Sequence, residues 1–155
     1  MVNFEGLKQE AIAWTKEYCK ALNDNKMYAM AAKGWGVGFE GALHIILEAC
    51  GEIEEDVGAF IDLKNGKCDG ITILKPGDEP PRKPILKISG SMFNWKKVAF
   101  KEVEIIPSLM SGLLKLEGEM SLAMRYARAA MELINTMEKT DRTLFSKYDL
   151  ENGAK

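Results

Sequence analysis

Several features that would point to a definite class of protein are scarce in this sequence. It contains one histidine and three cysteines, and its charges nearly balance at a net charge of −2. A nucleic-acid-binding domain usually carries a basic field, so this balance argues against a nucleic-acid partner. No run of residues approaches the ~20 apolar positions that are needed to cross a bilayer. We therefore expect a soluble protein.

The number and spacing of the cysteines indicate the redox state of the cellular compartment. Cys19, Cys50 and Cys68 are odd in number and widely spaced, which argues against a disulfide framework and favours reduced thiols. The first residues lack the basic-then-apolar order of a signal peptide. Both observations predict a cytoplasmic protein.

The apolar content is sufficient for one ordinary hydrophobic core. The chain has 155 residues, of which 46% are hydrophobic and 28% are charged, and this excludes disordered and fibrous classes. We find no internal repeat and no domain boundary. The sequence therefore predicts a single domain over residues 1–155.

The spacing of apolar residues predicts the order of helices and strands. Leu7, Ala11 and Trp14 recur at intervals of three and four, which is typical of an amphipathic helix, whereas Asn65-Gly66 is a strong hairpin turn signal. The order of elements predicts an α+β domain with a mostly antiparallel sheet and helices packed on one face. The expected helices are 4–23, 27–33, 107–112 and 119–139, together with one that is capped by Ser89 or Ser91 and ends near Phe100. The expected strands are 35–47, 57–63, 67–74, 85–88 and 114–117, and the first of them has a kink at Gly41.

The residues that are best suited to chemistry stand alone in the sequence. His44 lies within an apolar strand and has no partner at the spacing of a metal site, so we interpret it as structural. A nucleophilic Cys-His pair stays open as an alternative. The glycines at 34, 36 and 38 do not open onto a helix as a phosphate loop would, and the acidic residues in 52–56 are interpreted as a solvated turn. We expect no catalytic residue, no metal and no cofactor.

Methionines gather on one face of the last expected helix. Methionine adapts to varied apolar shapes and recurs at promiscuous binding surfaces. Composition alone favours an ordinary core stripe, and a face that docks a partner helix or a second copy of the chain is a third possibility. The stripe consists of Met120, Met124, Ala127, Met131 and Ile134, and Ala123, Ala130 and Met137 lie beside it.

Residues 112–124 contain a recognisable motif. They begin Gly-Leu-Leu-Lys-Leu-Glu-Gly-Glu-Met and continue into small apolar positions, and this order resembles the signature of the sterol-carrier-protein type 2 family. Upstream, Ile88-Ser89-Gly90 with Trp95, and then Pro107 to Gly112, are similar to a stand-alone prokaryote-type branch of that family. The resemblance covers about residues 28–145 and leaves residues 1–27 as an N-terminal helical extension.

The resemblance implies a five-stranded sheet that is covered by helices and encloses an apolar tunnel. It also implies non-catalytic binding or carriage of a fatty acid, acyl-CoA, sterol-like or phospholipid ligand, with at most transient contact with a membrane surface. A homodimer is compatible with it. An enzyme or accessory subunit that acts on a lipid-like substrate, and an interaction module that uses the methionine face, are the alternatives.

The same resemblance implies which residues contact the ligand. Leu113, Glu117 and Glu119 depart from the basic or amidic residues of the signature, which weakens the expectation of an anionic headgroup. The implied ligand-binding residues are Trp95, Val98, Ile106, Leu109, Met110, Leu114, Leu116, Met120, Met124, Ala127 and Met131.

Overall fold

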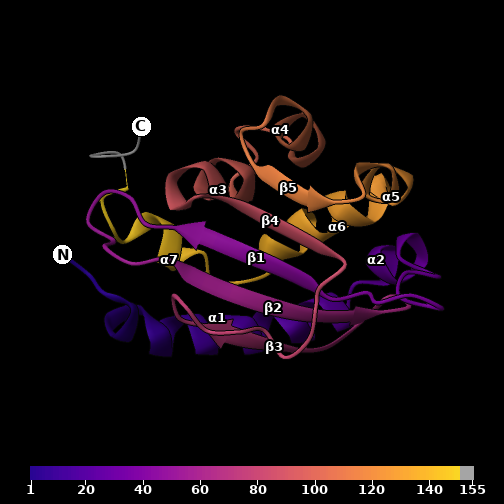
Figure 1. Ribbon diagram of the computed structural model, residues 1–155, viewed down its shortest axis with the longest axis horizontal. Coiled ribbons are helices and arrows are strands. Elements are labelled where there is room, and N and C mark those ends of the chain that lie inside the picture. The colour runs from indigo at the N-terminus through magenta and orange to yellow at the C-terminus, as the bar shows by residue number, and fades with distance from the viewer. Residues whose placement is uncertain (151–155) are drawn as a thin grey trace.

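A single five-stranded sheet organises the protein, and its strands follow the spatial order β3-β2-β1-β4-β5 (Figure 1). The computed structural model describes residues 1–150. β1 and β4 pair in parallel, and the other neighbours are antiparallel. The predicted α+β class with a mostly antiparallel sheet is therefore confirmed. The strands are β1 (Leu43–Glu48), β2 (Val57–Lys64), β3 (Lys67–Leu74), β4 (Leu86–Ser91) and β5 (Lys115–Gly118).

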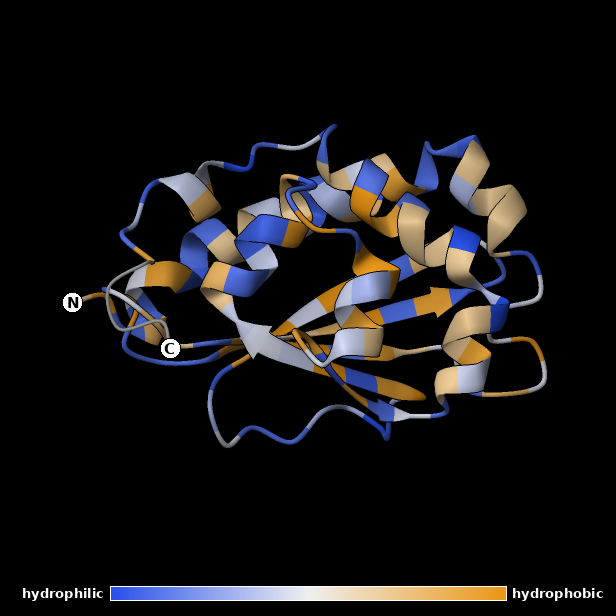
Figure 2. Cartoon of the chain, turned by 90° about the horizontal axis from the view of Figure 1, so that it is seen from above, coloured by the Kyte–Doolittle hydropathy of each residue, from blue (hydrophilic) through white to orange (hydrophobic). Residues whose placement is uncertain are grey.

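The helices gather on one side of this sheet (Figure 2). Three of them begin at side-chain caps. Asn3 accepts a hydrogen bond from the Gly6 amide, Asn25 accepts one from the Tyr28 amide, and Ser91 accepts one from the Asn94 amide. The opposite face of the sheet carries no helix among residues 1–150 (Figure 1). The helices are α1 (Phe4–Asn23), α2 (Lys26–Ala31), α3 (Met92–Ala99), α4 (Ile105–Ser111), α5 (Met120–Arg125), α6 (Ala127–Met137) and α7 (Thr143–Ser146).

Two turns that the sequence indicated have the expected backbone. Asn65 and Gly66 both have positive φ, at 51° and 82°, as a tight hairpin between β2 and β3 requires. A Cβ on Gly66 would lie 2.7 Å from the Ala29 carbonyl oxygen, so glycine also allows α2 to approach this turn. Gly112 ends α4 with φ at 83°.

The expected strand 35–47 is wrong over its first half. Gly34, Gly36 and Gly38 have φ of 92°, 80° and 82°, which a strand does not adopt, and the chain forms successive turns there. The Trp35 indole donates to the Gly41 carbonyl at 2.8 Å and closes this looped segment. Only Leu43–Glu48 pairs as β1.

The expected helix 119–139 is also wrong, because it is two helices. Tyr126 departs from helical geometry, with φ at −106° and ψ at 31°, and separates α5 from α6. Its ring packs edge-on against Trp35, with 5.0 Å between ring centroids. The methionine stripe therefore does not run along one continuous helix.

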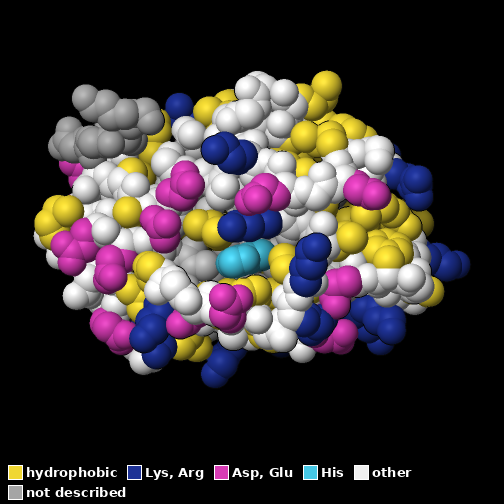
Figure 3. Space-filling view, viewed as in Figure 1, with side chains coloured by type: hydrophobic (Ala, Val, Ile, Leu, Met, Phe, Trp, Pro, Cys, Tyr) yellow, Lys and Arg dark blue, Asp and Glu magenta, His cyan; other side chains and the backbone are white. Residues whose placement is uncertain are grey.

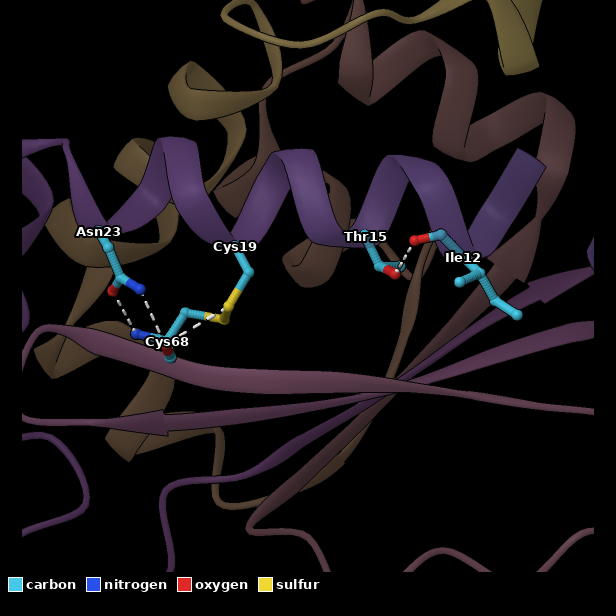
Figure 4. Close-up of a disulfide and its surroundings, with 5 residues drawn as sticks. All are labelled: Ile12, Thr15, Cys19, Asn23 and Cys68. Atoms are coloured by element: carbon cyan, nitrogen blue, oxygen red, sulfur yellow. Dashed lines mark hydrogen bonds between the residues drawn. A yellow bond between two sulfur atoms is a disulfide. The ribbon is translucent and has the colours of Figure 1, made fainter. Parts of the chain in front are cut away.

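A disulfide corrects the expectation of reduced thiols. Cys19 of α1 and Cys68 of β3 are bonded, and they are 49 positions apart in the sequence (Figure 4). The side chain of Asn23 reinforces this link, since it accepts from the Cys68 amide at 2.8 Å and donates to the Cys68 carbonyl at 2.9 Å. Sequence spacing could not reveal the pair, because only the fold brings the end of α1 over β3.

Candidate functional site

An apolar cavity of about 170 Å³ lies between the sheet and its covering helices. Its floor comes from alternate residues of the strands, since successive side chains of a strand point to opposite faces. On β1 these residues are Leu43, Ile45 and Leu47, and on β2 they include Ala59 and Ile61. The helix-covered face of the sheet thus presents only aliphatic side chains to the cavity.

The helices supply the walls and the roof. α1 contributes Leu7, Ala11, Trp14 and Tyr18, which are the residues of its amphipathic face. This helix lies in the predicted N-terminal extension 1–27 and forms part of the cavity wall. Trp35 and Tyr126, which lie outside the helices, also line the cavity. The helices α2 to α7 contribute chiefly Tyr28, Trp95, Leu109, Ala123, Ala130, Ile134, Met137, Leu144 and Phe145.

The polar atoms of the aromatic wall residues are mostly engaged within the protein. The Trp14 indole donates to the Thr140 hydroxyl at 3.0 Å, and the Trp95 indole donates to the Ile46 carbonyl at 2.9 Å. Tyr18 donates its hydroxyl to the Leu133 carbonyl at 2.7 Å. No charged side chain among residues 1–150 borders the cavity. The cavity can therefore hold an apolar molecule but offers it few polar contacts.

The sequence-predicted site residues fall into four groups. Trp95 and Leu109 line the cavity. Val98 and Leu114 are fully buried in the core beside it without lining it, whereas Met110 and Met131 are 71% and 50% exposed. The other predicted residues are half-buried and do not line the cavity, namely Ile106, Leu116, Met120, Met124 and Ala127.

Most of the cavity lining was missed by the sequence analysis, although signals for it existed. Ala123, Ala130 and Met137, which lie beside the methionine stripe, line the cavity, whereas Ile134 is the one residue of the stripe that lines it. The amphipathic face of α1 and the alternation along β1 and β2 were visible as core patterns. Nothing in those patterns distinguishes a residue that packs against the core from one that borders a void.

The one histidine lies on the other face of the sheet, away from the cavity. His44 is half-buried among charged side chains there (Figure 3). Burial and the neighbouring Lys87 lower the pKa of His44, which favours its neutral form. Among residues 1–150, no cluster of histidine, cysteine and acidic side chains is arranged to hold a metal ion.

The thiols are also engaged away from the histidine. Cys19 and Cys68 share the disulfide, and the sulfur of the buried Cys50 accepts a hydrogen bond from the Phe93 amide at 3.3 Å. Within the described residues, none of these sulfur atoms contacts His44. In the same part of the chain, no helix has the length and apolar character that a bilayer span requires.

The fold and the cavity define an α+β domain with an apolar cavity between its sheet and its helices. The chain belongs to the SCP-2 sterol transfer family, whose sequence model matches residues 38–131. The family is one of lipid binding or transfer, and this confirms the resemblance found in residues 112–124. No curated protein matches the chain.

Solved structures agree with this family assignment. A crystal structure of sterol carrier protein 2 is 27% identical, with a TM-score of 0.70, and the match covers 83% of this chain and 96% of that one. A conserved hypothetical protein from Thermus thermophilus, described as a possible sterol carrier protein, is 28% identical with a TM-score of 0.70 and covers 82% and 85%. Apo sterol carrier protein 2 from Yarrowia lipolytica shares the fold at 17% identity and a TM-score of 0.51, over 79% and 88%.

Proposed function

We propose that this protein binds and carries an apolar, lipid-like small molecule in the cavity and performs no chemistry on it. The observation that carries this proposal is the cavity wall, which is aliphatic and aromatic and lacks charged side chains among residues 1–150. Burial of apolar ligand surface contributes roughly 25 cal/mol per Å², so such a wall binds without specific polar contacts. A carrier of this kind needs no catalytic group.

The size of the cavity bears on which ligands enter without rearrangement. An engineered protein cavity of about 150 Å³ holds one benzene molecule. The cavity of about 170 Å³ is therefore suited to a ring-sized apolar group. A sterol or a long acyl chain requires the wall helices to move apart, and α1, α6 and α7 each contribute to that wall. We propose that this movement extends the cavity into the tunnel that the family resemblance implies.

The sequence-predicted ligand contacts enter this proposal in two ways. We propose that Trp95 and Leu109, which border the cavity, contact the ligand directly. The predicted contacts that do not border the cavity would be reached only in an enlarged form. These are Val98, Ile106, Met110, Leu114, Leu116, Met120, Met124, Ala127 and Met131.

A matched pair of variants on α6 tests where the ligand binds. Ala130→Trp fills the cavity, whereas Met131→Lys alters the neighbouring residue, which is 50% exposed. We expect Ala130→Trp to reduce binding of a ring-sized neutral probe such as methylcyclohexane strongly, and Met131→Lys to leave this binding unchanged. Loss of binding in Met131→Lys alone would place the site on the methionine stripe instead.

Native mass spectrometry with organic extraction supplies the direct test of carriage. We expect a lipid-like molecule to co-purify with the protein or to be taken up from solution. A protein that purifies empty and also binds no neutral apolar probe would contradict the proposal.

A second candidate function is presentation of the ligand to a partner protein. The observation that favours it is the exposure of Met110 and Met131, at 71% and 50%, on two helices of the roof. A ubiquinone synthesis protein of the UbiJ-SCP2 type shares the fold at 12% identity, with a TM-score of 0.52. Light scattering tests the simplest form of this function, because a methionine face that joins two copies of the chain would give a homodimer.

A further inference from the structure

Two buried tyrosines border the cavity and differ in one respect. Tyr18 on α1 is 4% exposed and Tyr28 on α2 is 1% exposed. The hydroxyl of Tyr18 donates to the Leu133 carbonyl at 2.7 Å. The hydroxyl of Tyr28 makes no hydrogen bond with any of residues 1–150, although its backbone amide donates to the Asn25 side chain. Tyr28 therefore brings an unpaired hydroxyl to an otherwise apolar site.

The position of this hydroxyl follows from its surroundings. In the described part of the chain, no side-chain oxygen or nitrogen that is sealed from open space lacks a partner. The unpaired Tyr28 hydroxyl consequently touches open space, and Tyr28 is one of the residues that line the cavity. An unpaired buried hydroxyl is costly, so a ligand that pairs with it gains affinity.

Other polar groups of the wall are less available to a ligand. The Thr15 hydroxyl donates to the Ile12 carbonyl at 2.8 Å. The indoles of Trp14, Trp35 and Trp95 each donate within the protein. The hydroxyl of the half-buried Tyr126 lies 3.1 Å from the Cβ position of Gly34, in the turns that precede β1. Among the fully buried side chains of residues 1–150 that line the cavity, Tyr28 thus supplies the unpaired hydroxyl.

We propose that the Tyr28 hydroxyl selects the ligand of this cavity, and that it selects a neutral apolar molecule with one oxygen group over a carboxylate. This inference rests on the proposed function, because it concerns the same cavity. A protonated phenol both donates and accepts, so it pairs with an alcohol, a ketone or an ester. A carboxylate would be desolvated without a cation, since no basic side chain of residues 1–150 borders the cavity.

Burial keeps this hydroxyl in its protonated form. It raises the pKa of Tyr28 well above its ordinary value, and the same effect raises the pKa of Tyr18. At neutral pH the group is thus uncharged and adds no repulsion or attraction of its own. Selection depends on hydrogen bonding and on the absence of a counter-ion.

Three ring-sized probes test this selection on the full chain. Methylcyclohexane, cyclohexanol and cyclohexanecarboxylate share one frame and differ in a methyl, a hydroxyl and an anionic group. Their binding is measured by NMR titration at pH 7 with the native protein and with Tyr28→Phe, which keeps the ring and removes the hydroxyl. We expect Tyr28→Phe to weaken cyclohexanol by about fivefold or more and to leave methylcyclohexane unchanged. The carboxylate should bind neither protein detectably.

The outcomes separate this inference from the proposed function. If methylcyclohexane binds the native protein but Tyr28→Phe leaves cyclohexanol unaffected, the selection by Tyr28 is wrong and the cavity site stands. Binding of the carboxylate as tightly as the alcohol would also overturn the selection. If neither neutral probe binds, both the cavity site and the selection fail.

The stability of the unliganded protein provides a second, independent readout. Removal of an unpaired hydroxyl should leave the melting temperature unchanged or raise it, whereas removal of a paired one should lower it. We expect the first result for Tyr28→Phe and the second for the control Tyr18→Phe, which loses the bond to Leu133. An equal decrease in both variants would show that the Tyr28 hydroxyl already has a partner, and this would overturn the inference.

Discussion

The two faces of the sheet are made from the same strands and have opposite chemistry. Along β1, Leu43, Ile45 and Leu47 face the cavity, whereas His44 belongs to the face that no described helix covers (Figure 3). The composition of each face follows from the strand geometry, because successive side chains of a strand point to opposite faces. One face borders the apolar cavity and the covering helices, and the other presents charged side chains to water.

The face without helices is organised by ion pairs and by the segment that precedes β4. Arg82 of that segment contacts Glu40 at 2.6 Å and Asp62 at 2.6 Å. Its guanidinium also lies 5.2 Å from the centre of the Phe60 ring. Phe60 forms a small second core there with Ala42 and Leu74. In this arrangement Arg82 covers an apolar residue of the polar face.

The proposed binding site and the ionisable groups of the polar face are on opposite sides of the sheet. His44 and the ion pairs lie on one side of the sheet, and the apolar cavity lies on the other side. A ligand in the cavity would be screened from those groups by the sheet itself. This separation keeps His44 and these ion pairs away from the proposed ligand site, because they cannot reach it without a change of fold.

The largest expected effect comes from placing a carboxylate on the cavity face. Ile45→Glu puts a charge among aliphatic side chains, whereas His44→Glu puts the same group beside Lys87 on the other face. An unpaired buried charge costs about 4 kcal/mol, so Ile45→Glu should unfold the protein or lower its free energy of unfolding by that amount. Urea denaturation measures both variants. Similar losses in the two would contradict the assignment of the faces.

Removal of the disulfide should give the next largest loss of stability. The bond joins α1 to the sheet on the face that borders the cavity. Cys19→Ser with Cys68→Ser should lower the free energy of unfolding by about 2–4 kcal/mol, because the bond closes a long loop of the unfolded chain. The paired hydrogen bonds from Asn23 to Cys68 should keep α1 in place, so the native fold should persist in circular dichroism.

Thiol counting checks the bond itself. Denatured protein that is kept without reductant should show the thiol of Cys50 and no other. All three cysteines reacting would contradict the bond and would support the predicted cytoplasmic location, since disulfides persist mainly in oxidising compartments.

The sequence was sufficient for the elements that depend on local signals. The caps Asn3 and Ser91, the turn Asn65-Gly66 and the end of α4 at Gly112 are set by residues close in the chain. These signals, together with the residues that resemble the family signature, were enough to predict the class of fold. The family match over residues 38–131 agrees with them.

The remaining features depend on contacts between distant residues. The break at Tyr126 accompanies its packing on Trp35, and the pairing of Cys19 with Cys68 requires α1 to lie over β3. The break separates the two halves of the methionine stripe, so that Ala130 lines the cavity while Met131 is exposed. Helical periodicity cannot predict such a break, because it assumes one continuous helix axis.

The smallest expected effect belongs to the polar face and appears only as pH is lowered. Burial, with the nearby Lys87, lowers the pKa of His44 in the folded protein, so the unfolded chain binds this proton more readily. Stability should be greatest above the unfolded pKa of about 6.5 and should fall as pH drops from there towards the folded value. His44→Gln should remove this part of the pH dependence in urea denaturation and leave probe binding in the cavity unchanged at every pH. A loss of binding in His44→Gln would connect the two faces and would contradict their separation by the sheet.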